Sequence, residues 1–315
     1  MAKNTGLVVK AQSGFFTVQP DGGGEPVICQ IRGRLKQERL RTDIVAAGDR
    51  VGYVVNDDGT GQIESVAERV SVLSRTRTAA DQRNLQTDRE QILVANPDQV
   101  VFVFSVRNPL FSPRKLDRFL VVAEMNRLPA IICANKVDLV EPAGSRAMFQ
   151  VYEDIGYSVI HTSTLTGEGI DVLRGRLKGR ISVLAGSSGV GKSSLLNAIQ
   201  DGLGLRVRHV SEATGKGLHT TRHVELIPLE VGGYVADTPG IRSLALFDVE
   251  PGELDAYYRE IAPLVKLCQF SDCTHTHEPK CAVRAAVENG RVAEERYDSY
   301  LRLREELTDL EGKRY

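Results

Sequence analysis

The segment GSSGVGKSS, Gly186–Ser194, has the residue types and the spacing that bind nucleotide phosphates. It fits the pattern G-x-x-x-x-G-K-[ST], in which glycines let backbone N–H groups surround a phosphate, a lysine adds a positive charge and a hydroxyl can ligate Mg²⁺. A Gly/Ser-rich turn that matches by chance is the alternative interpretation. The phosphate-binding residues predicted here are Gly186, Ser187, Ser188, Gly189, Val190, Gly191, Lys192, Ser193 and Ser194.

A second polar motif, NKVD at residues 135–138, directly follows the apolar run Ala130–Ala134. Guanine presents two neighbouring donors that one carboxylate, such as Asp138, can accept together, whereas adenine presents an acceptor there. Taken alone, the tetrapeptide could be a solvated turn. Residues 162–164 follow the next apolar run and can place backbone N–H groups against the base oxygen, although Ser and Thr are also typical of helix caps. The predicted guanine-binding residues are Asn135, Lys136, Val137, Asp138 and Ser163.

Two further segments can sense the terminal phosphate of a bound nucleotide. The polar, glycine-containing stretch 206–223 offers Thr220 or Thr221 to close on Mg²⁺, in the manner of an order–disorder switch. The motif DTPG at residues 237–240 lets Asp237 hold the magnesium shell and lets the Gly240 N–H approach the phosphate without a side chain in the way. The predicted magnesium ligands are Ser193, Thr221 and Asp237.

Ile241 occupies the position at which Ras-like enzymes carry the glutamine that orients the attacking water. Because an aliphatic side chain cannot hydrogen-bond water, we expect slow hydrolysis by the isolated protein and completion of the site by its own loop or by a partner. His219 is the nearest ionisable candidate, and an exposed loop histidine is the alternative. The catalytic candidates are His219, Lys192 and Gly240.

Near-continuous apolar runs that alternate with helical patterns must position these motifs. This alternation predicts an α/β domain with a parallel sheet, in which ligands bind at the carboxyl ends of the strands. The expected strands are Val100–Ser105, Ala130–Ala134, Ser158–His161, Ile181–Ala185 and Tyr234–Ala236, and the clearest helices are Pro113–Met125 and Lys192–Ile199.

Residues 1–72 are predicted to form a small β-barrel of the OB type, because short strand-like segments alternate with Gly/Asp-rich turns. A basic run between the third and fourth segments can bind RNA phosphates, although a solvated loop is the alternative. The RNA-binding candidates are Arg32, Arg34, Lys36, Arg39 and Arg41. The expected strands are Leu7–Lys10, Phe15–Val18, Val27–Gln30, Arg50–Val55 and Gln62–Val66.

Two segments near the barrel carry weaker signals. Phe15, Phe16 and Tyr53 can stack on bases, but their alternating positions in strands favour the barrel core. Residues 73–90 are polar and rich in arginine, which predicts a linker or mobile loop.

A short C-terminal stretch gathers three cysteines and a histidine: Cys268, Cys273, His275 and Cys281. Three thiolates and an imidazole suit a closed tetrahedral zinc site, with one structural ion per chain. His277 is the alternative fourth ligand, and buried unpaired cysteines are the alternative to a metal site. Helices are expected at Cys281–Ala286 and Tyr297–Leu310, and the strand residues Cys29 and Cys133 are expected in the core.

The composition limits the classes of protein. A chain of 315 residues with 42% hydrophobic residues suits two or three domains, which we place at 1–72, 73–247 and 248–315. A formal net charge of -1 excludes a global basic field, so any nucleic-acid binding must come from local patches. The first residues lack the apolar core of a signal peptide, and no run approaches the ~20 apolar residues of a membrane span. We therefore expect a cytoplasmic protein, and the five cysteines do not suggest a disulfide framework.

Together the motifs NKVD, GSSGVGKS, the threonine loop and DTPG resemble those of translation-factor-type GTPases. Here the guanine motif precedes the phosphate loop, as in circularly permuted GTPases. With the barrel and the zinc segment, the whole chain resembles the RsgA (YjeQ) family of ribosome small-subunit-dependent GTPases. The resemblance implies GTP hydrolysis stimulated by the small ribosomal subunit during its late maturation, contacts with ribosomal RNA, and a role for His219. GTP, GDP and the small subunit are the expected partners of a monomeric protein.

Three other functions explain only part of the chain. A P-loop ATPase or small-molecule kinase would explain Gly186–Ser194 but would leave NKVD without a role. A non-catalytic RNA-binding scaffold would explain the barrel and the zinc segment but not Asp237 and Gly240. A permuted GTPase that acts on the large subunit is a closer alternative, less well supported because a zinc segment follows the switch motifs here.

Overall fold

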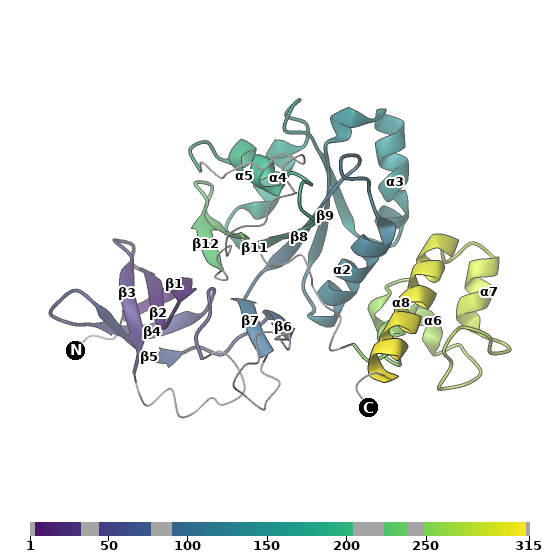
Figure 1. The fold of residues 1–315 in the computed structure, drawn as a ribbon, viewed down its shortest axis with the longest axis horizontal. Helices are drawn as coiled ribbons and strands as arrows, with labels where there is room; N and C mark the ends of the chain where they lie inside the picture. Colours follow the sequence, from purple (N-terminus) through teal and green to yellow (C-terminus); the bar gives the residue numbers. More distant parts are fainter. Residues whose placement is uncertain (1–3, 33–43, 77–89, 204–223, 238–248, 313–315) are drawn as a thin grey trace.

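The computed structural model describes residues 4–32, 44–76, 90–203, 224–237 and 249–312 of the chain (Figure 1). An N-terminal β-barrel and a C-terminal helical segment lie at opposite ends of the longest axis, with an α/β domain between them. This arrangement confirms the predicted fold class. The domain boundaries drawn at residues 72 and 247 stay a proposal. No helix in the described ranges is long and apolar enough to cross a membrane.

Five strands form the barrel, in the order predicted. They are β1 (Asn4–Gln12), β2 (Phe15–Pro20), β3 (Val27–Ile31), β4 (Arg50–Val55) and β5 (Gly61–Val66). The barrel closes because β1 pairs with both β2 and β4, while β3 pairs with β5. Phe16, Tyr53 and Cys29 are buried in its core, as expected. Phe15 is 51% exposed, so its expected place in the core is wrong: it points to the opposite face of β2 from Phe16.

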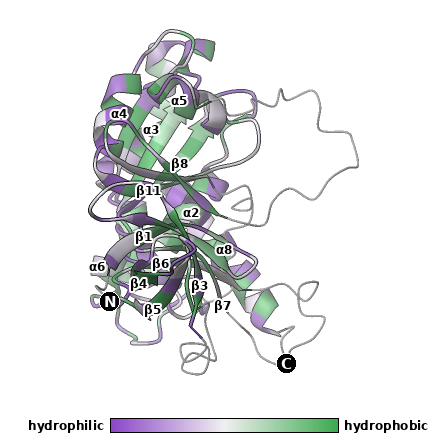
Figure 2. Ribbon diagram, turned by 90° about the vertical axis from the view of Figure 1, so that its left-hand side faces the viewer, coloured by the Kyte–Doolittle hydropathy of each residue, from purple (hydrophilic) through white to green (hydrophobic). Residues whose placement is uncertain are grey.

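The sheet of the α/β domain has the strand order β10-β9-β8-β11-β13-β12, in which only β12 is antiparallel to its neighbour. The expectation of a parallel sheet therefore holds for five of these six strands. Their bounds are β8 (Gln99–Ser105), β9 (Ala130–Asn135), β10 (Ser158–Thr162), β11 (Arg180–Ala185), β12 (Glu225–Pro228) and β13 (Gly233–Asp237). In Figure 2, β8 is coloured as hydrophobic, which fits a strand whose residues are all buried.

Helices cover both faces of this sheet. Alternate residues of β8, β9 and β11 pack with α2 (Pro113–Met125) and α3 (Pro142–Asp154) on one face. The other residues of these strands pack with α4 (Ile170–Leu177) and α5 (Lys192–Ile199) on the opposite face. Burial on both faces explains why the strands read as continuous apolar runs, and Cys133 is fully buried among them.

The linker or mobile loop expected at residues 73–90 is wrong at both of its ends, which are strands, and residues 77–89 between them lie outside the described residues. Strands β6 (Val72–Thr76) and β7 (Glu90–Ala95) pair as an antiparallel hairpin on either side of residues 77–89. The hairpin is hydrogen-bonded to the barrel: the Ala95 N–H donates to the Ala47 carbonyl at 2.8 Å. A Cβ atom at Gly48 would lie 1.9 Å from the Ala95 carbonyl oxygen, so only glycine fits there.

The barrel also joins the sheet of the α/β domain directly. Lys10 of β1 pairs with Glu225 of β12, and the two side chains form an ion pair at 2.9 Å. Through this contact one eleven-stranded sheet runs from β10 to β4.

The C-terminal segment packs on the α2 side of the α/β domain. Its elements are η5 (Leu254–Tyr257), α6 (Ala262–Val265), α7 (Ala282–Glu288) and α8 (Glu294–Gly312). Their buried residues share one core with α2 and α3, and α8 lies beside α2 (Figure 1). The segment is therefore docked on the α/β domain.

Candidate nucleotide site and candidate metal centre

The phosphate loop follows β11 and ends where α5 begins at Lys192, as predicted. Two of its glycines are needed for packing. A Cβ atom at Gly186 would lie 2.3 Å from the Val103 carbonyl oxygen, and one at Gly191 would lie 2.3 Å from the Asn135 Nδ2. Gly191 also has a φ of +101°, in the left-handed region that favours glycine. The helix terminus that follows presents N–H groups and the positive end of the helix dipole to an anion.

The ammonium group of Lys192 lies across this loop. It donates to the carbonyl oxygens of Gly186 at 2.8 Å and Ser187 at 3.0 Å. The positive charge is therefore held at the place where a phosphate would bind. Ser193, the proposed magnesium ligand, lies half-buried in the first turn of α5.

The guanine motif is bonded to the phosphate loop. The Asn135 amide donates to the Val190 carbonyl at 2.8 Å, and Lys136 donates to the carbonyl oxygens of Gly189, at 2.7 Å, and Asn108. Partial burial lowers the pKa of Lys136, and the nearby Asp138 charge acts in the opposite direction. The structure thus brings together the two motifs that the sequence separates.

Asp138 is exposed, and its carboxylate is hydrogen-bonded to the buried residue Ser163. Asp138 belongs to η2 (Val137–Leu139), which follows β9, while Ser163 is fully buried after β10. The Ser163 hydroxyl donates to the Asp138 carboxylate at 2.5 Å and accepts from the backbone N–H groups of Leu165 and Thr166, both at 3.2 Å. The Ser163 N–H, which we expected to face the base, donates to the Glu168 carbonyl at 3.0 Å. Ser163 therefore contacts the motif through its hydroxyl.

Most of the residues predicted in the two switch segments lie outside the described residues: His219, Thr220, Thr221, Gly240 and Ile241. Asp237 ends β13, and its backbone is level with Leu184 of β11, the strand that leads into the phosphate loop. That register places the Asp237 backbone beside the end of the strand that leads into the phosphate loop, and residues 238–240 of the motif lie outside the described residues.

Of the basic run, only Arg32 is described. It follows β3, its side chain is 58% exposed, and it forms an ion pair with Glu64 at 2.5 Å. Arg34, Lys36, Arg39 and Arg41 lie outside the described residues.

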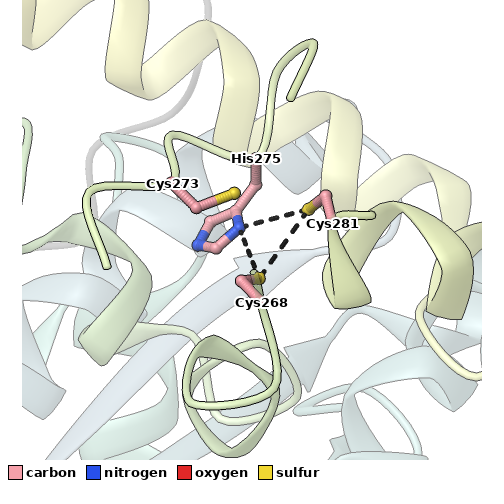
Figure 3. A group of neighbouring side chains, drawn as sticks. All are labelled: Cys268, Cys273, His275 and Cys281. Atoms are coloured by element: carbon pink, nitrogen blue, oxygen red, sulfur yellow. Dashed lines mark hydrogen bonds between the residues drawn. The ribbon is translucent and has the colours of Figure 1, made fainter. Parts of the chain in front are cut away.

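The three late cysteines and His275 converge on one point (Figure 3). Their ligand atoms all lie within 4.8 Å of one another. The Cys268 and Cys281 sulfurs are 4.0 Å apart, and the His275 Nδ1 is 3.6 Å and 3.4 Å from them. Tetrahedral zinc with bonds of about 2.3 Å to sulfur separates neighbouring sulfurs by about 3.8 Å. The donor set therefore fits zinc. His277, the alternative ligand, is exposed and bonded to Thr276.

The thiols of this cluster differ in their proton affinity. Burial raises the pKa of Cys273 to about 12. Burial acts in the same direction on Cys281, yet the Arg284 N–H and His275 hold its pKa below the ordinary value. Because a coordinated thiol is deprotonated outright, a bound cation would overcome the burial of Cys273. Burial also raises the pKa of the two core thiols outside the cluster, to about 11 for Cys29 and about 12 for Cys133.

Two family models match most of the chain. The one described as RsgA GTPase covers residues 66–247, and the one described as RsgA N-terminal domain covers residues 5–63. The chain belongs to the RsgA GTPase family. Relatives named small ribosomal subunit biogenesis GTPase RsgA are 42% identical in Thermotoga petrophila and 46% identical in Gemmatimonas aurantiaca. The alignments cover 97% of this chain and 97% of the first relative, and 96% of this chain and 97% of the second.

Solved structures of RsgA relatives share the fold. The crystal structure of YjeQ from Thermotoga maritima has a TM-score of 0.79 at 39% identity, and the match covers 98% of this chain and 99% of that one. The structure of YloQ, described as a circularly permuted GTPase, has a TM-score of 0.75 at 34% identity, with 98% and 96% covered. The RsgA fold thus accounts for the order in which the motifs occur along the sequence.

Two polar contacts of this RsgA-family protein, one at the guanine motif and one at the cysteine–histidine cluster, were not predicted from the sequence. The Asn108 carbonyl accepts from Lys136, and the Asp255 carboxylate lies 3.2 Å from the His275 Nε2. Neither residue belongs to a motif. A carbonyl has no side-chain signature, and Asp255 lies outside the cysteine-rich stretch, so only the fold brings them to the site.

We expect Asp138→Asn to weaken GTP binding by ~1–3 kcal/mol or more and to raise the affinity for xanthosine triphosphate. Asparagine replaces a carboxylate that accepts two hydrogen bonds with an amide that also presents a donor. Titration calorimetry with both nucleotides measures the change. Asp171→Asn, at an exposed α4 carboxylate, is the control for charge loss. A variant at position 138 that still prefers GTP would contradict the assignment.

We expect Cys273→Ala, or treatment with a chelator, to remove zinc and to loosen the C-terminal segment while nucleotide affinity stays near normal. The reason is that metal binding supplies folding free energy to that segment, whereas the hydrogen bonds described between the phosphate loop and the guanine motif do not involve it. Metal analysis and hydrogen exchange check the two effects. His277→Ala is the control and should keep its zinc. Wild-type protein without zinc in reducing buffer would refute the prediction.

Proposed function

We propose that this protein is a GTPase of small ribosomal subunit biogenesis. It hydrolyses GTP during late maturation of the subunit, is stimulated by the subunit, and contacts ribosomal RNA. Support comes from relatives that carry this name and align over nearly the full length of the chain. We further propose that the protein acts as a monomer in the cytoplasm, with domains at 1–72, 73–247 and 248–315.

One observation carries the nucleotide part of this proposal: the guanine motif is hydrogen-bonded to the phosphate loop. Asn135 and Lys136 donate to carbonyl groups of that loop, and Ser163 holds Asp138. A P-loop ATPase or small-molecule kinase has no use for a carboxylate placed to accept from guanine. This favours GTP over ATP.

The proposed cofactors are Mg²⁺ with the nucleotide and one structural zinc. Ser193, Asp237 and Thr221 would hold the Mg²⁺, which would offset negative charge on the nucleotide phosphates. Lys192 adds a charge from the other end of the loop, and Gly240 and His219 are the proposed residues near the reacting phosphate. Cys268, Cys273, His275 and Cys281 would hold the zinc.

RNA contacts are proposed for the barrel end. Arg32 is exposed, and its partner Glu64 is on the same barrel. Exposed ion pairs contribute little free energy, so exchange of Glu64 for an RNA phosphate costs little. Arg34, Lys36, Arg39 and Arg41 complete the proposed patch.

Hydrolysis assays with purified subunits test the proposal. GTP and ATP are compared, each alone, with mature or nearly mature small subunits, and with large subunits at the same concentration. We expect turnover of GTP only, with stimulation by small subunits. Stimulation by large subunits instead would favour the large-subunit alternative, and equal use of ATP would refute guanine specificity.

A further inference from the structure

The two ring nitrogens of His275 face different chemical groups. Nδ1 points to the cysteine sulfurs, and Nε2 points away from them (Figure 3), 3.2 Å from the Asp255 Oδ2. The His275 side chain is fully buried, and the Asp255 side chain is 15% exposed. Both contacts are therefore sheltered from water.

This arrangement favours the neutral tautomer that carries its proton on Nε2. An ionised carboxylate can only accept a hydrogen bond, so the nitrogen that faces Asp255 must be the donor. The neutral imidazole has a single N–H, which leaves the Nδ1 lone pair directed at the sulfurs. That lone pair is what a metal ion requires.

We propose that Asp255 is a positioning residue of the zinc site, which holds His275 in the tautomer that binds zinc through Nδ1. The inference rests on the proposed zinc site and adds to its four ligands one residue that acts through His275. Carboxylate partners of this kind fix the ring orientation and raise the basicity of the ligand.

The other side of His275 is fixed as well. The residue has a φ of +62°, and its carbonyl oxygen accepts from the Tyr297 hydroxyl of α8 at 2.6 Å. The neighbouring Thr274 carbonyl accepts from the Tyr300 hydroxyl at 3.1 Å. The ligand is thus clamped between α8 and the η5 residue Asp255, and η5 also packs against α2. Zinc binding through His275 would therefore connect the cysteine-rich loop to an element that contacts the nucleotide-binding domain.

Nitrogen NMR on the full-length, zinc-loaded wild-type protein tests the tautomer without any substitution. With ¹⁵N-labelled histidine we expect His275 to show a protonated Nε2 and a metal-bound Nδ1. Replacement of zinc by ¹¹³Cd should give a coupling to Nδ1 only. Coupling to Nε2, or a ring protonated at both nitrogens, would overturn the proposal. Protein that binds no metal would refute the zinc site itself, and this inference with it.

Variants then test the role of the carboxylate. Asp255→Ala should weaken zinc binding roughly 10- to 100-fold in competition with a chromophoric chelator. Asp255→Asn, which keeps an acceptor but loses the charge, should fall between Asp255→Ala and wild type. Asp272→Asn removes the same charge from an exposed position next to Cys273 and should change the affinity less than 2-fold. If Asp255→Ala binds zinc as tightly as Asp272→Asn, Asp255 has no positioning role.

Discussion

Turnover of GTP by the isolated protein should be slow, and saturating small ribosomal subunits should raise it on the order of 10³- to 10⁵-fold. The reason lies at Ile241, where an aliphatic side chain stands in place of a water-orienting amide. The phosphate loop and the guanine loop are hydrogen-bonded to each other, so we expect nucleotide binding to need no partner and only the chemical step to depend on one.

His219→Ala should abolish this stimulation and leave GTP affinity near the wild-type value. A group that acts only in the transition state lowers turnover without changing the binding of the ground state. Single-turnover hydrolysis with and without subunits, next to equilibrium binding of a GTP analogue, separates the two effects. His223→Ala, in the same polar stretch, is the matched control and should be stimulated normally. If the isolated protein is as fast as the subunit-bound one, or if His219→Ala is stimulated normally, a partner-completed site must be abandoned.

Arg296→Met should destabilise the docked C-terminal segment by about 3–5 kcal/mol, because it leaves two buried carboxylates without their cation. Arg296 of α8 is 2% exposed and bonds Asp117 of α2 and, at 2.6 Å, Glu260. Asp117 is 1% exposed, and burial raises its pKa although Arg296 acts in the opposite direction. The Tyr152 hydroxyl donates to the same carboxylate at 2.9 Å.

Hydrogen exchange of α8 measures this effect, since the chain has no tryptophan to report on unfolding. Arg302→Met is the matched control: Arg302 lies on the same helix, 53% exposed, and pairs only with Asp298 among the ion pairs described. Its loss should cost about 0.3–0.5 kcal/mol. Adding Asp117→Asn to Arg296→Met should recover part of the stability, because it removes one unpaired charge. Equal exchange rates in the two single variants would show that the buried pair does not hold the segment.

The sequence predicted best those features that depend on neighbouring residues. Helices α2 and α5 have the expected bounds, because each combines a clear start signal with an apolar face. The four residues of the cysteine–histidine cluster were also predicted, because they lie within one short loop and are therefore close together in the sequence. Phe15 was misplaced because alternation along a strand does not show which of its two faces is buried.

What the sequence could not show depends on distant parts of the chain. Strand β7 is short and adjoins a polar, arginine-rich stretch, and it becomes a strand by pairing with β6 and docking on Ala47. Asp255 carries no motif, and neither does the edge contact between Lys10 and Glu225. Such contacts are set by tertiary packing, which no local pattern reports.

The position of β13 in the sheet determines when the two parts of the sheet can join during synthesis of the chain. β13 pairs with β11 on one side and with β12 on the other, and β12 in turn reaches back to β1 of the barrel. The barrel strands leave the ribosome first and can close among themselves, since domains generally fold as units from the N-terminus. Strands β10, β9, β8 and β11 pair with one another and are all synthesised before Gly233–Asp237. What depends on β13 is the connection of these strands to β12 and, through β12, to the barrel, so the last of the described strands to be synthesised completes the continuous sheet.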